Sequence, residues 1–258
     1  MKKHKKKFKL IVFGYEFPHY KTENGLRELI ANGYEISLVI LQKFKKLSVP
    51  ISKTNVYVKP NSTGNIKELC KINDIKYIVS NHDSNLTIKA LKKIKPYLGV
   101  ILGARILKKK TIDCFSYGIM NMHPGDIPIN RGLDNFKWAL VNQYPMTVTS
   151  HLISDKIDLG RIILKSNVNV YKNDTVYDLS TRHFHNEFKL MISSLKYLGR
   201  NHMLPWNSRA TIIPRIIMQI KESPRYPIDF ILLLFLWNFL SLFNAEEIRQ
   251  KIIIITVV

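Results

Sequence analysis

The chain has 258 residues, 46% of them hydrophobic, and a formal net charge of +21 from 40 Lys and Arg against 19 Asp and Glu. This hydrophobic content is enough for a folded core and excludes an intrinsically disordered chain. The charge would attract nucleic acid, acidic lipid or phosphorylated small molecules. However, Lys, Ile and Asn are abundant along the whole sequence, and no common nucleic-acid-binding signature is present. The charge alone therefore does not predict a nucleic-acid partner.

Two features bear on the cellular compartment. The two cysteines, Cys70 and Cys114, show no metal-ligand spacing, and a reduced cytoplasmic setting is the simplest interpretation. The basic N-terminus MKKHKKKFKL is not followed by an apolar stretch with a small-residue cleavage site, so we expect no signal peptide. The sequence thus predicts a cytoplasmic protein without a metal site.

The first half of the chain alternates between apolar strand patterns and helical patterns. Strands are expected at residues 8–14, 35–41, 76–80, 99–103 and 118–123, with a short one in TNVYVK at residues 54–59. Helices are expected at residues 22–34, where Gly33 can stop the helix, and at 62–74, 85–98 and 107–115. Strands separated by helices predict an α/β fold with a mostly parallel sheet and helices on both faces.

The second half has a different pattern. A helix is expected at residues 134–144, followed by two strands at 147–154 and 161–170 that would pair antiparallel across the turn DKIDLG. A long amphipathic helix is expected from Thr175 to Leu198. Composition shifts after about residue 200, so we divide the chain into a catalytic domain of residues 1–200 and an extension of residues 201–258.

The extension contains the apolar run IDFILLLFLWNFLSLF at residues 228–243. This run is shorter than the about 20 apolar residues that a membrane-spanning helix needs. We favour a buried or subunit-interface helix, which would suit a homodimer. A weak contact with a membrane surface is the alternative, because Arg215, Lys221 and Arg225 precede the run. The final IIIITVV predicts a strand that needs a partner.

The segment NMHPGDIPINRG, residues 121–132, carries the strongest candidate for chemistry. Asn121 and His123 are two residues apart on an expected strand, so they project from the same face. Pro124 interrupts strand pairing, and ligand sites of parallel sheets lie at the carboxyl ends of strands. A neutral His can accept and return a proton near neutral pH, and an Asn amide can donate to a developing oxyanion.

A carboxylate often orients such a histidine. The nearest acids along the chain are Asp126, Asp134, Asp155 and Asp158, and spacing alone does not choose among them. Each one taken singly also fits a solvated turn residue, and the loop taken singly also fits a surface turn.

The linked pattern resembles the core of the folate-dependent formyltransferase family. The family pattern is Asn-x-His-Pro, Leu-Pro, Arg-Gly, Trp-Ala, Thr-x-His and Asp-x-Gly in order, and this chain departs from it by having Ile127 before Pro128. The matching residues are Asn121, His123, Pro124, Pro128, Arg131, Gly132, Trp138, Ala139, Thr149, His151, Asp158 and Gly160. Upstream, ILGARIL at residues 101–107 resembles the family segment that lines the folate pterin pocket. The resemblance covers roughly residues 8 to 170. It implies a Rossmann-like fold, with 10-formyltetrahydrofolate as formyl donor.

The resemblance also implies roles for single residues. Asn121, His123 and Asp158 would be the catalytic trio, and it is the resemblance that selects Asp158. Ile127-Pro128 resembles a cis-proline position, and His151 would either support the site or pack within its strand. The residues implied for the folate are Gly103, Arg105, Ile106, Leu107, Ser154 and Asp155. Those expected at the acceptor are Tyr15, His19, Lys21, Arg131 and Gly132.

Three branches of that family compete. HPG followed by NRG is closest to the sugar-nucleotide N-formyltransferases, which suggests an amino-sugar nucleotide as acceptor and a place in polysaccharide biosynthesis. Methionyl-tRNA formyltransferases, which act on aminoacyl-tRNA, carry a C-terminal β-barrel, and residues after about 200 do not show several short strands. The glycinamide ribonucleotide branch has a Gly/Ser-rich phosphate loop that GYEFPHYKT, residues 14–22, lacks. A non-catalytic protein that binds folate or a sugar nucleotide remains an alternative.

Overall fold

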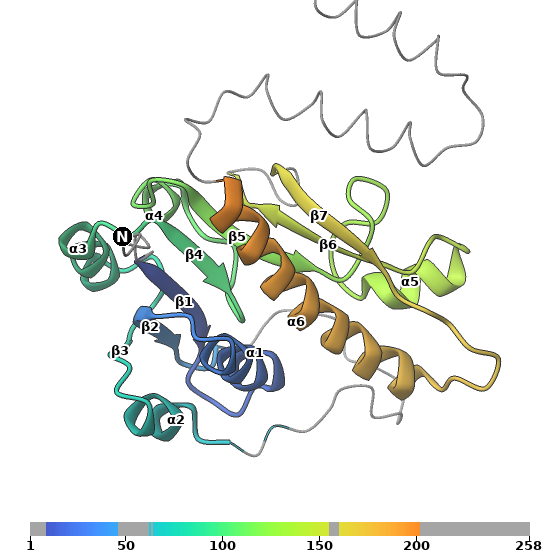
Figure 1. Ribbon diagram of the computed structural model, residues 1–258, viewed down its shortest axis with the longest axis horizontal. Coiled ribbons are helices and arrows are strands. Elements are labelled where there is room, and N and C mark those ends of the chain that lie inside the picture. The colour runs from blue at the N-terminus through green and yellow to red at the C-terminus, as the bar shows by residue number, and fades with distance from the viewer. Residues whose placement is uncertain (1–8, 46–61, 63, 155–159, 202–258) are drawn as a thin grey trace, which may run out of the picture. The chain divides into compact units, whose positions relative to one another are not determined.

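The computed structural model describes residues 9–45, 62, 64–154 and 160–201, which form one sheet with helices on both faces (Figure 1). The strands are β1 Leu10–Tyr15, β2 Ile36–Gln42, β3 Tyr77–Val79, β4 Leu98–Ile101, β5 Gly118–His123, β6 Thr147–Leu152 and β7 Ile162–Asn167. The helices are α1 Tyr20–Ala31, α2 Ile66–Ile72, α3 Asn85–Ile94, α4 Lys109–Ile112, α5 Asn135–Val141 and α6 Val176–Asn201.

The seven strands follow the order β3-β2-β1-β4-β5-β6-β7. The first five strands in this order are parallel, and β6 runs antiparallel to both of its neighbours, β5 and β7, so β7 has the direction of the first five. This confirms the predicted α/β class and the antiparallel strand pair. The direction of winding reverses between β1 and β4, and open α/β sheets bind ligands at the carboxyl edge beside such a switch point.

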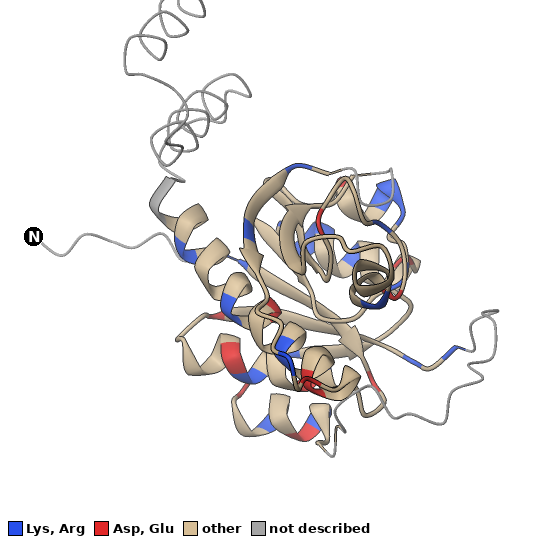
Figure 2. Ribbon diagram, turned by 90° about the vertical axis from the view of Figure 1, so that its right-hand side faces the viewer, with Lys and Arg blue, Asp and Glu red and all other residues tan. Residues whose placement is uncertain are grey.

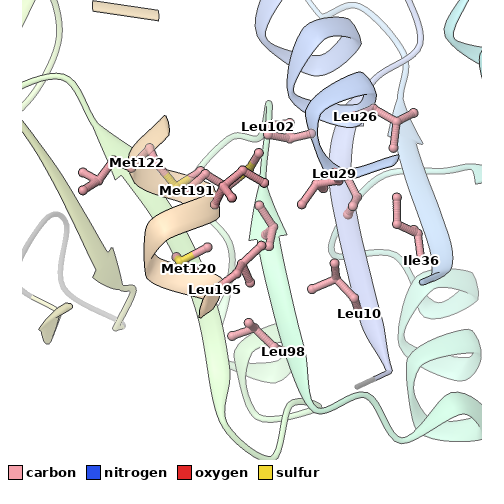
Figure 3. Packing of buried hydrophobic residues seen from close by; sticks show 14 of the residues in the cluster. Leu10, Leu26, Leu29, Ile36, Leu98, Leu102, Met120, Met122, Met191 and Leu195 are labelled. Carbon is pink, nitrogen blue, oxygen red and sulfur yellow. The ribbon is translucent and has the colours of Figure 1, made fainter. Parts of the chain in front are cut away.

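Apolar side chains cover both faces of the sheet. On one face, Leu26 and Leu29 of α1 and the α6 side chains pack over the central strands. Met191 and Leu195 of α6 lie over Met120 and Met122 of β5 (Figure 3). On the other face, Leu91 of α3 packs with side chains of β1, β2 and β5. Each face therefore has its own core, and β5 is held from both sides.

Most helix boundaries follow the capping signals. Ser84 begins α3 by accepting from the backbone N–H of Thr87. The expected helix of residues 85–98 is wrong at its end, because α3 stops at Ile94 and Leu98 opens β4. Lys95 is left-handed at φ 53°, and Pro96 disfavours a helical conformation in the residue before it. The expected helix of residues 62–74 begins only at Ile66, where the Asn65 side chain caps it.

Several predictions fall outside the described residues. These are the short strand at residues 54–59, the acids Asp155 and Asp158, and the extension beyond residue 201 with its apolar run. The domain boundary at residue 200 therefore stays a prediction. Within the ranges that are described, no helix is both long and apolar enough to cross a membrane. Lys and Arg occur on helices over both faces of the sheet (Figure 2), which fits a compositional bias better than a single binding patch.

Candidate active site

Asn121 and His123 lie at the carboxyl end of β5 and project from the same face, as predicted. His123 is buried, at 3% exposure, and Asn121 is half-buried. Met122 between them turns to the opposite face and joins the core. Across β6, Asn121 is paired with His151 and His123 with Thr149. The Asn-x-His and Thr-x-His motifs are thus neighbours in one antiparallel ladder.

The His123 ring is held through Nε2. This nitrogen lies 2.8 Å from the backbone oxygen of Asn130 and 3.1 Å from the side-chain nitrogen of Asn135. A carbonyl oxygen can only accept, so the shorter contact, to Asn130, requires the hydrogen on Nε2, and in that tautomer the Asn135 amide lies beside Nε2 without donating to it. The lone pair of a neutral ring is then on Nδ1, which is the nitrogen able to take up a proton from a substrate.

Hydrogen bonds from the adjacent strands fix the loop after β5. The Thr149 hydroxyl donates to the carbonyl of Gly125 at 2.7 Å, and Lys165 of β7 donates to the carbonyl of Ile127 at 2.8 Å. Within the loop, the Asn130 amide donates to the carbonyl of Asn135 at 2.7 Å. The Ile127-Pro128 peptide bond is cis, which confirms the resemblance at that position.

Gly125 is a position where this loop packs closely against His123. A Cβ atom there would lie 2.7 Å from the backbone oxygen of Asn130 and 3.1 Å from His123 Nε2. Both distances are shorter than ordinary van der Waals contact. The absence of a side chain at this position is therefore a requirement of the site, whatever the φ angle.

Asn121 contacts the second histidine. Its Nδ2 lies 3.3 Å from Nε2 of His151, a residue with no exposed surface. An amide nitrogen carries two hydrogens. With one directed at His151, the other can donate to an oxygen in front of the strand. Through this contact His151 can orient the Asn121 amide, which is the supporting role that the sequence left open.

Of the four candidate acids, two are described, and each has a lysine partner. Asp126 forms an ion pair with Lys165. Asp134 precedes α5 and pairs with Lys137 at 2.9 Å on an exposed surface. Asp158 lies outside the described residues, as does Asp155, so the part that Asp158 plays beside His123 stays a prediction.

A cavity of about 370 Å³ lies at the carboxyl ends of β2, β3 and β4. Three residues assigned to the folate line it, namely Arg105, Ile106 and Leu107. Its other lining residues are Gln42, Lys45, Asn81, His82, Asp83, Ser84 and Lys108. Ile101 at the end of β4 is paired with Asn121, so the segment that lines the cavity leaves the sheet beside β5.

The remaining two described folate candidates are placed differently. A Cβ atom on Gly103 would lie 2.7 Å from the Tyr15 ring, so this glycine allows close packing against the loop after β1. Ser154 is half-buried just beyond the end of β6, on the segment that leads to residues 155–159.

The acceptor candidates after β1 have structural contacts of their own. The ring of Tyr15 stacks on Phe17 with centroids 4.9 Å apart, and burial raises the pKa of its phenol. His19 caps α1, with Nδ1 2.8 Å from the Thr22 hydroxyl. Lys21 forms an ion pair with Glu187 of α6 and donates to the carbonyl of Met122 at 2.9 Å.

The other two acceptor candidates, Arg131 and Gly132, are exposed on the loop after β5. Three contributors were missed by sequence reasoning: Asn130, Asn135 and Glu187. Glu187 left a signal, because it is an acid within the apolar stripe of a long helix, four residues before Met191. The two asparagines left none, since Asn is ordinary in a loop.

The sequence matches one family model, described as Formyl transferase, over residues 52–195. A methionyl-tRNA formyltransferase of Thermodesulfovibrio yellowstonii is 28% identical over 160 residues, which cover 61% of this chain and 50% of that protein. One from Borrelia turicatae is 24% identical over 189 residues, or 69% of this chain and 60% of that protein. The chain spans about half the length of the curated relatives it matches.

Solved structures share the fold. A phosphoribosylglycinamide formyltransferase from Brucella melitensis has a TM-score of 0.57 at 22% identity, covering 75% of this chain and 96% of that chain. A sugar N-formyltransferase from Shewanella sp. has a TM-score of 0.53 at 17% identity, covering 75% and 71%. At these identities the likeness establishes a common fold and leaves the acceptor open.

Proposed function

The chain belongs to the formyl transferase family, and from this premise we propose that it transfers a formyl group from 10-formyltetrahydrofolate to a primary amine. The observation that carries the proposal is the pairing of Asn121 and His123 at the end of β5, with His123 fixed through Nε2 and Asn121 directed by His151. A proton acceptor and an uncharged oxyanion donor on one strand face suit attack of an amine on a formyl carbon.

The residues at the cavity fit the proposed donor. A folate carries fused and benzenoid rings together with glutamate carboxylates. Lys45, Arg105 and Lys108 provide positive charge for the carboxylates, and Ile106 and Leu107 provide apolar surface for the rings. When bound, 10-formyltetrahydrofolate supplies the activated formyl group. Arg105, Ile106 and Leu107 would hold this donor in the cavity, and Gly103, Ser154 and Asp155 complete the proposed contacts.

The proposed chemistry assigns one task to each residue. The second amide hydrogen of Asn121 donates to the oxygen that becomes negative as the amine attacks, and His123, once it has taken up the proton of that amine, adds positive charge there. His123, assisted by Asp158 or a bound water, moves the proton from the attacking amine to the departing folate nitrogen. The fixed ring of His123 reduces the reorganisation that this transfer requires.

For the acceptor we propose an amino-sugar nucleotide, because HPG followed by NRG is closest to the sugar-nucleotide branch. The expected contacts are Tyr15, His19, Arg131 and Gly132, with Lys21 considered separately below. The second candidate acceptor is methionyl-tRNA, which is favoured by one observation, the naming of the curated relatives.

The test is incubation of the protein with 10-formyltetrahydrofolate and a panel of nucleoside-diphosphate amino sugars, with methionyl-tRNA as a parallel arm. Mass spectrometry scores the gain of a formyl group. We expect gain on an amino sugar with the wild type and none with His123→Ala. Gain on methionyl-tRNA alone would replace the sugar acceptor, and gain on no amine would refute formyl transfer.

The His123→Ala variant also separates an enzyme from a binding protein. An enzyme keeps its affinity for 10-formyltetrahydrofolate, measured by calorimetry, but loses turnover. A protein that only binds folate or sugar nucleotide would show binding and no turnover in the wild type as well.

A further inference from the structure

Along β5, the carbonyl of Met122 lies between Asn121 and His123, one residue beyond the point where the neighbouring strand β4 ends. Ile153 donates to the carbonyl of Ile119, so alternate carbonyls of β5, those of Ile119 and Asn121, face β6. By the same alternation the carbonyl of Met122 faces β4. Because β4 ends at Ile101, opposite Asn121, no strand residue is left to donate to it.

Lys21 provides that donor. Its Nζ lies 2.9 Å from the Met122 oxygen, across a gap between α1 and β5. A buried backbone carbonyl without a partner is destabilising, so this bond replaces the missing ladder contact. It also ties down the peptide unit that joins Met122 to His123.

Glu187 of α6 holds Lys21 from the other side. The two side chains form an ion pair at 15% and 4% exposure. Burial raises the pKa of the Glu187 carboxyl, while the charges of Lys21 and His123 oppose that rise. Because Met191, one turn later on the same helix, packs in the cluster that contains Met122, α6 contacts this peptide both through Lys21 and through the core.

Resting on the proposed function, we propose that Lys21 is a positioning residue for formyl transfer. Held by the Glu187 carboxylate and donating to the Met122 carbonyl, it fixes the angle at which Asn121 and His123 face the reacting atoms. It does not touch the substrate in this role. A lysine that bound an acceptor phosphate would have to leave a buried carboxylate without its cation, which is strongly unfavourable.

The experiment compares four variants, assayed with the amine that the wild type formylates and 10-formyltetrahydrofolate. They are Lys21→Met, Lys21→Arg, the double variant Lys21→Met/Glu187→Leu, and the control Arg182→Met. Arg182 is a matched cation on α6, because it also pairs with an acid, Asp174, and donates to a backbone carbonyl, that of Asn169 at 2.8 Å. The readouts are kcat, the KM for the acceptor and the midpoint of urea unfolding.

We expect kcat of Lys21→Met to fall on the order of tenfold to a hundredfold with little change in KM, since misplacement of reacting groups acts on the rate. The arginine variant recovers part of kcat. The double variant removes both charges, so its unfolding midpoint returns toward the wild type, but its kcat stays low because the Met122 carbonyl still lacks a donor. Arg182→Met keeps the wild-type kcat.

Two kinetic results would overturn the proposal. If kcat of the double variant recovers together with its stability, Lys21 has only a structural role. If Lys21→Met raises KM and leaves kcat unchanged, Lys21 binds the acceptor. If Lys21→Met does not fold, the kcat and KM of the double variant Lys21→Met/Glu187→Leu decide between these two results.

A readout independent of the acceptor separates this inference from the proposed function. The imidazole nitrogen signals of His123 in NMR spectra, assigned by their loss in His123→Ala, should shift in the double variant and not in Arg182→Met. Unchanged signals overturn the positioning role whatever the acceptor is. If the signals shift but the protein formylates no amine, the result supports the positioning of His123 by Lys21, and only the proposed function is refuted.

Discussion

The two sides of the candidate site are built differently. On the side of the loop after β5, residues 124–135, the polar groups around His123 bond to one another and to β6 and β7. On the side of the cavity at the ends of β2, β3 and β4, exposed side chains such as Lys45, Asn81 and Lys108 form the walls. This difference suggests that His123 is held in position before any ligand binds, whereas the cavity beside it presents exposed side chains that can contact a ligand.

The position of each side in the sheet explains this contrast. β5 lies between β4 and β6, with α6 packed over its core face, so its end is constrained from several directions. β3 is the edge strand, and the winding of the chain reverses next to β1, so loops at this end have fewer neighbours.

His123→Ala should lower the rate of formyl transfer by about 10²- to 10⁴-fold, the usual contribution of a general acid–base group. Affinity for 10-formyltetrahydrofolate should be kept, because His123 does not line the cavity proposed for this donor. The control is His185→Ala, an exposed histidine on α6. Comparable rates for the two variants would show that the ordered loop is not the reacting side.

His183 of α6 should make stability depend on pH. Burial, with a smaller effect of the Arg182 charge, lowers its pKa from 6.5 to about 4, and neither ring nitrogen has a hydrogen-bond partner within the described residues. The unfolded chain therefore takes up a proton first as the pH falls from 6.5 toward 4, which favours unfolding.

The expected loss of stability from this residue is on the order of 3 kcal/mol at pH 4 relative to neutral pH. Urea unfolding of the wild type and of His183→Leu at both pH values isolates it, because other groups titrate equally in both proteins. Since His183 packs on Phe136 behind the loop, equal pH slopes would mean that this interior is more hydrated than the contacts indicate.

Gly125→Ala should reduce kcat on the order of tenfold by displacing the Asn130 carbonyl and His123. Gly99→Ala is the control, since its Cβ would also be crowded, at 3.0 Å from side-chain atoms of Ile119 and Phe115, but in the core. We expect this control to lose stability and keep kcat. A wild-type kcat for Gly125→Ala would contradict the tight fit around His123.

Arg105→Leu should raise the KM for 10-formyltetrahydrofolate about tenfold, the loss of roughly 1.4 kcal/mol of binding free energy. The kcat of this variant should change little, because Arg105 is proposed to bind the donor and not to take part in the reaction. Lys92→Met is the control, an exposed lysine beside a different cavity, near the end of α3. An effect on kcat larger than on KM would place Arg105 with the reacting residues.

The sequence was sufficient where a property depends on nearby residues. Asn121 and His123 share a face because side chains on a strand alternate, and this was predictable from a spacing of two. Hydrophobic periodicity predicted the order of strands and helices, and with it the α/β class. Pro96 and Asn65 also carried local signals for the helix boundaries that were misjudged.

Only the tertiary structure decided which residues meet across long separations. The carbonyl of Asn130 reaches His123, His151 reaches Asn121, and Lys21 of α1, which donates to the Met122 carbonyl of β5, joins Glu187 of α6. Ion pairs and hydrogen bonds act over a few ångströms, whereas Lys21 and Glu187 are far apart along the chain. Residue type and spacing determined what each side chain can do chemically, but the packing of helices on the sheet determined which partner it meets.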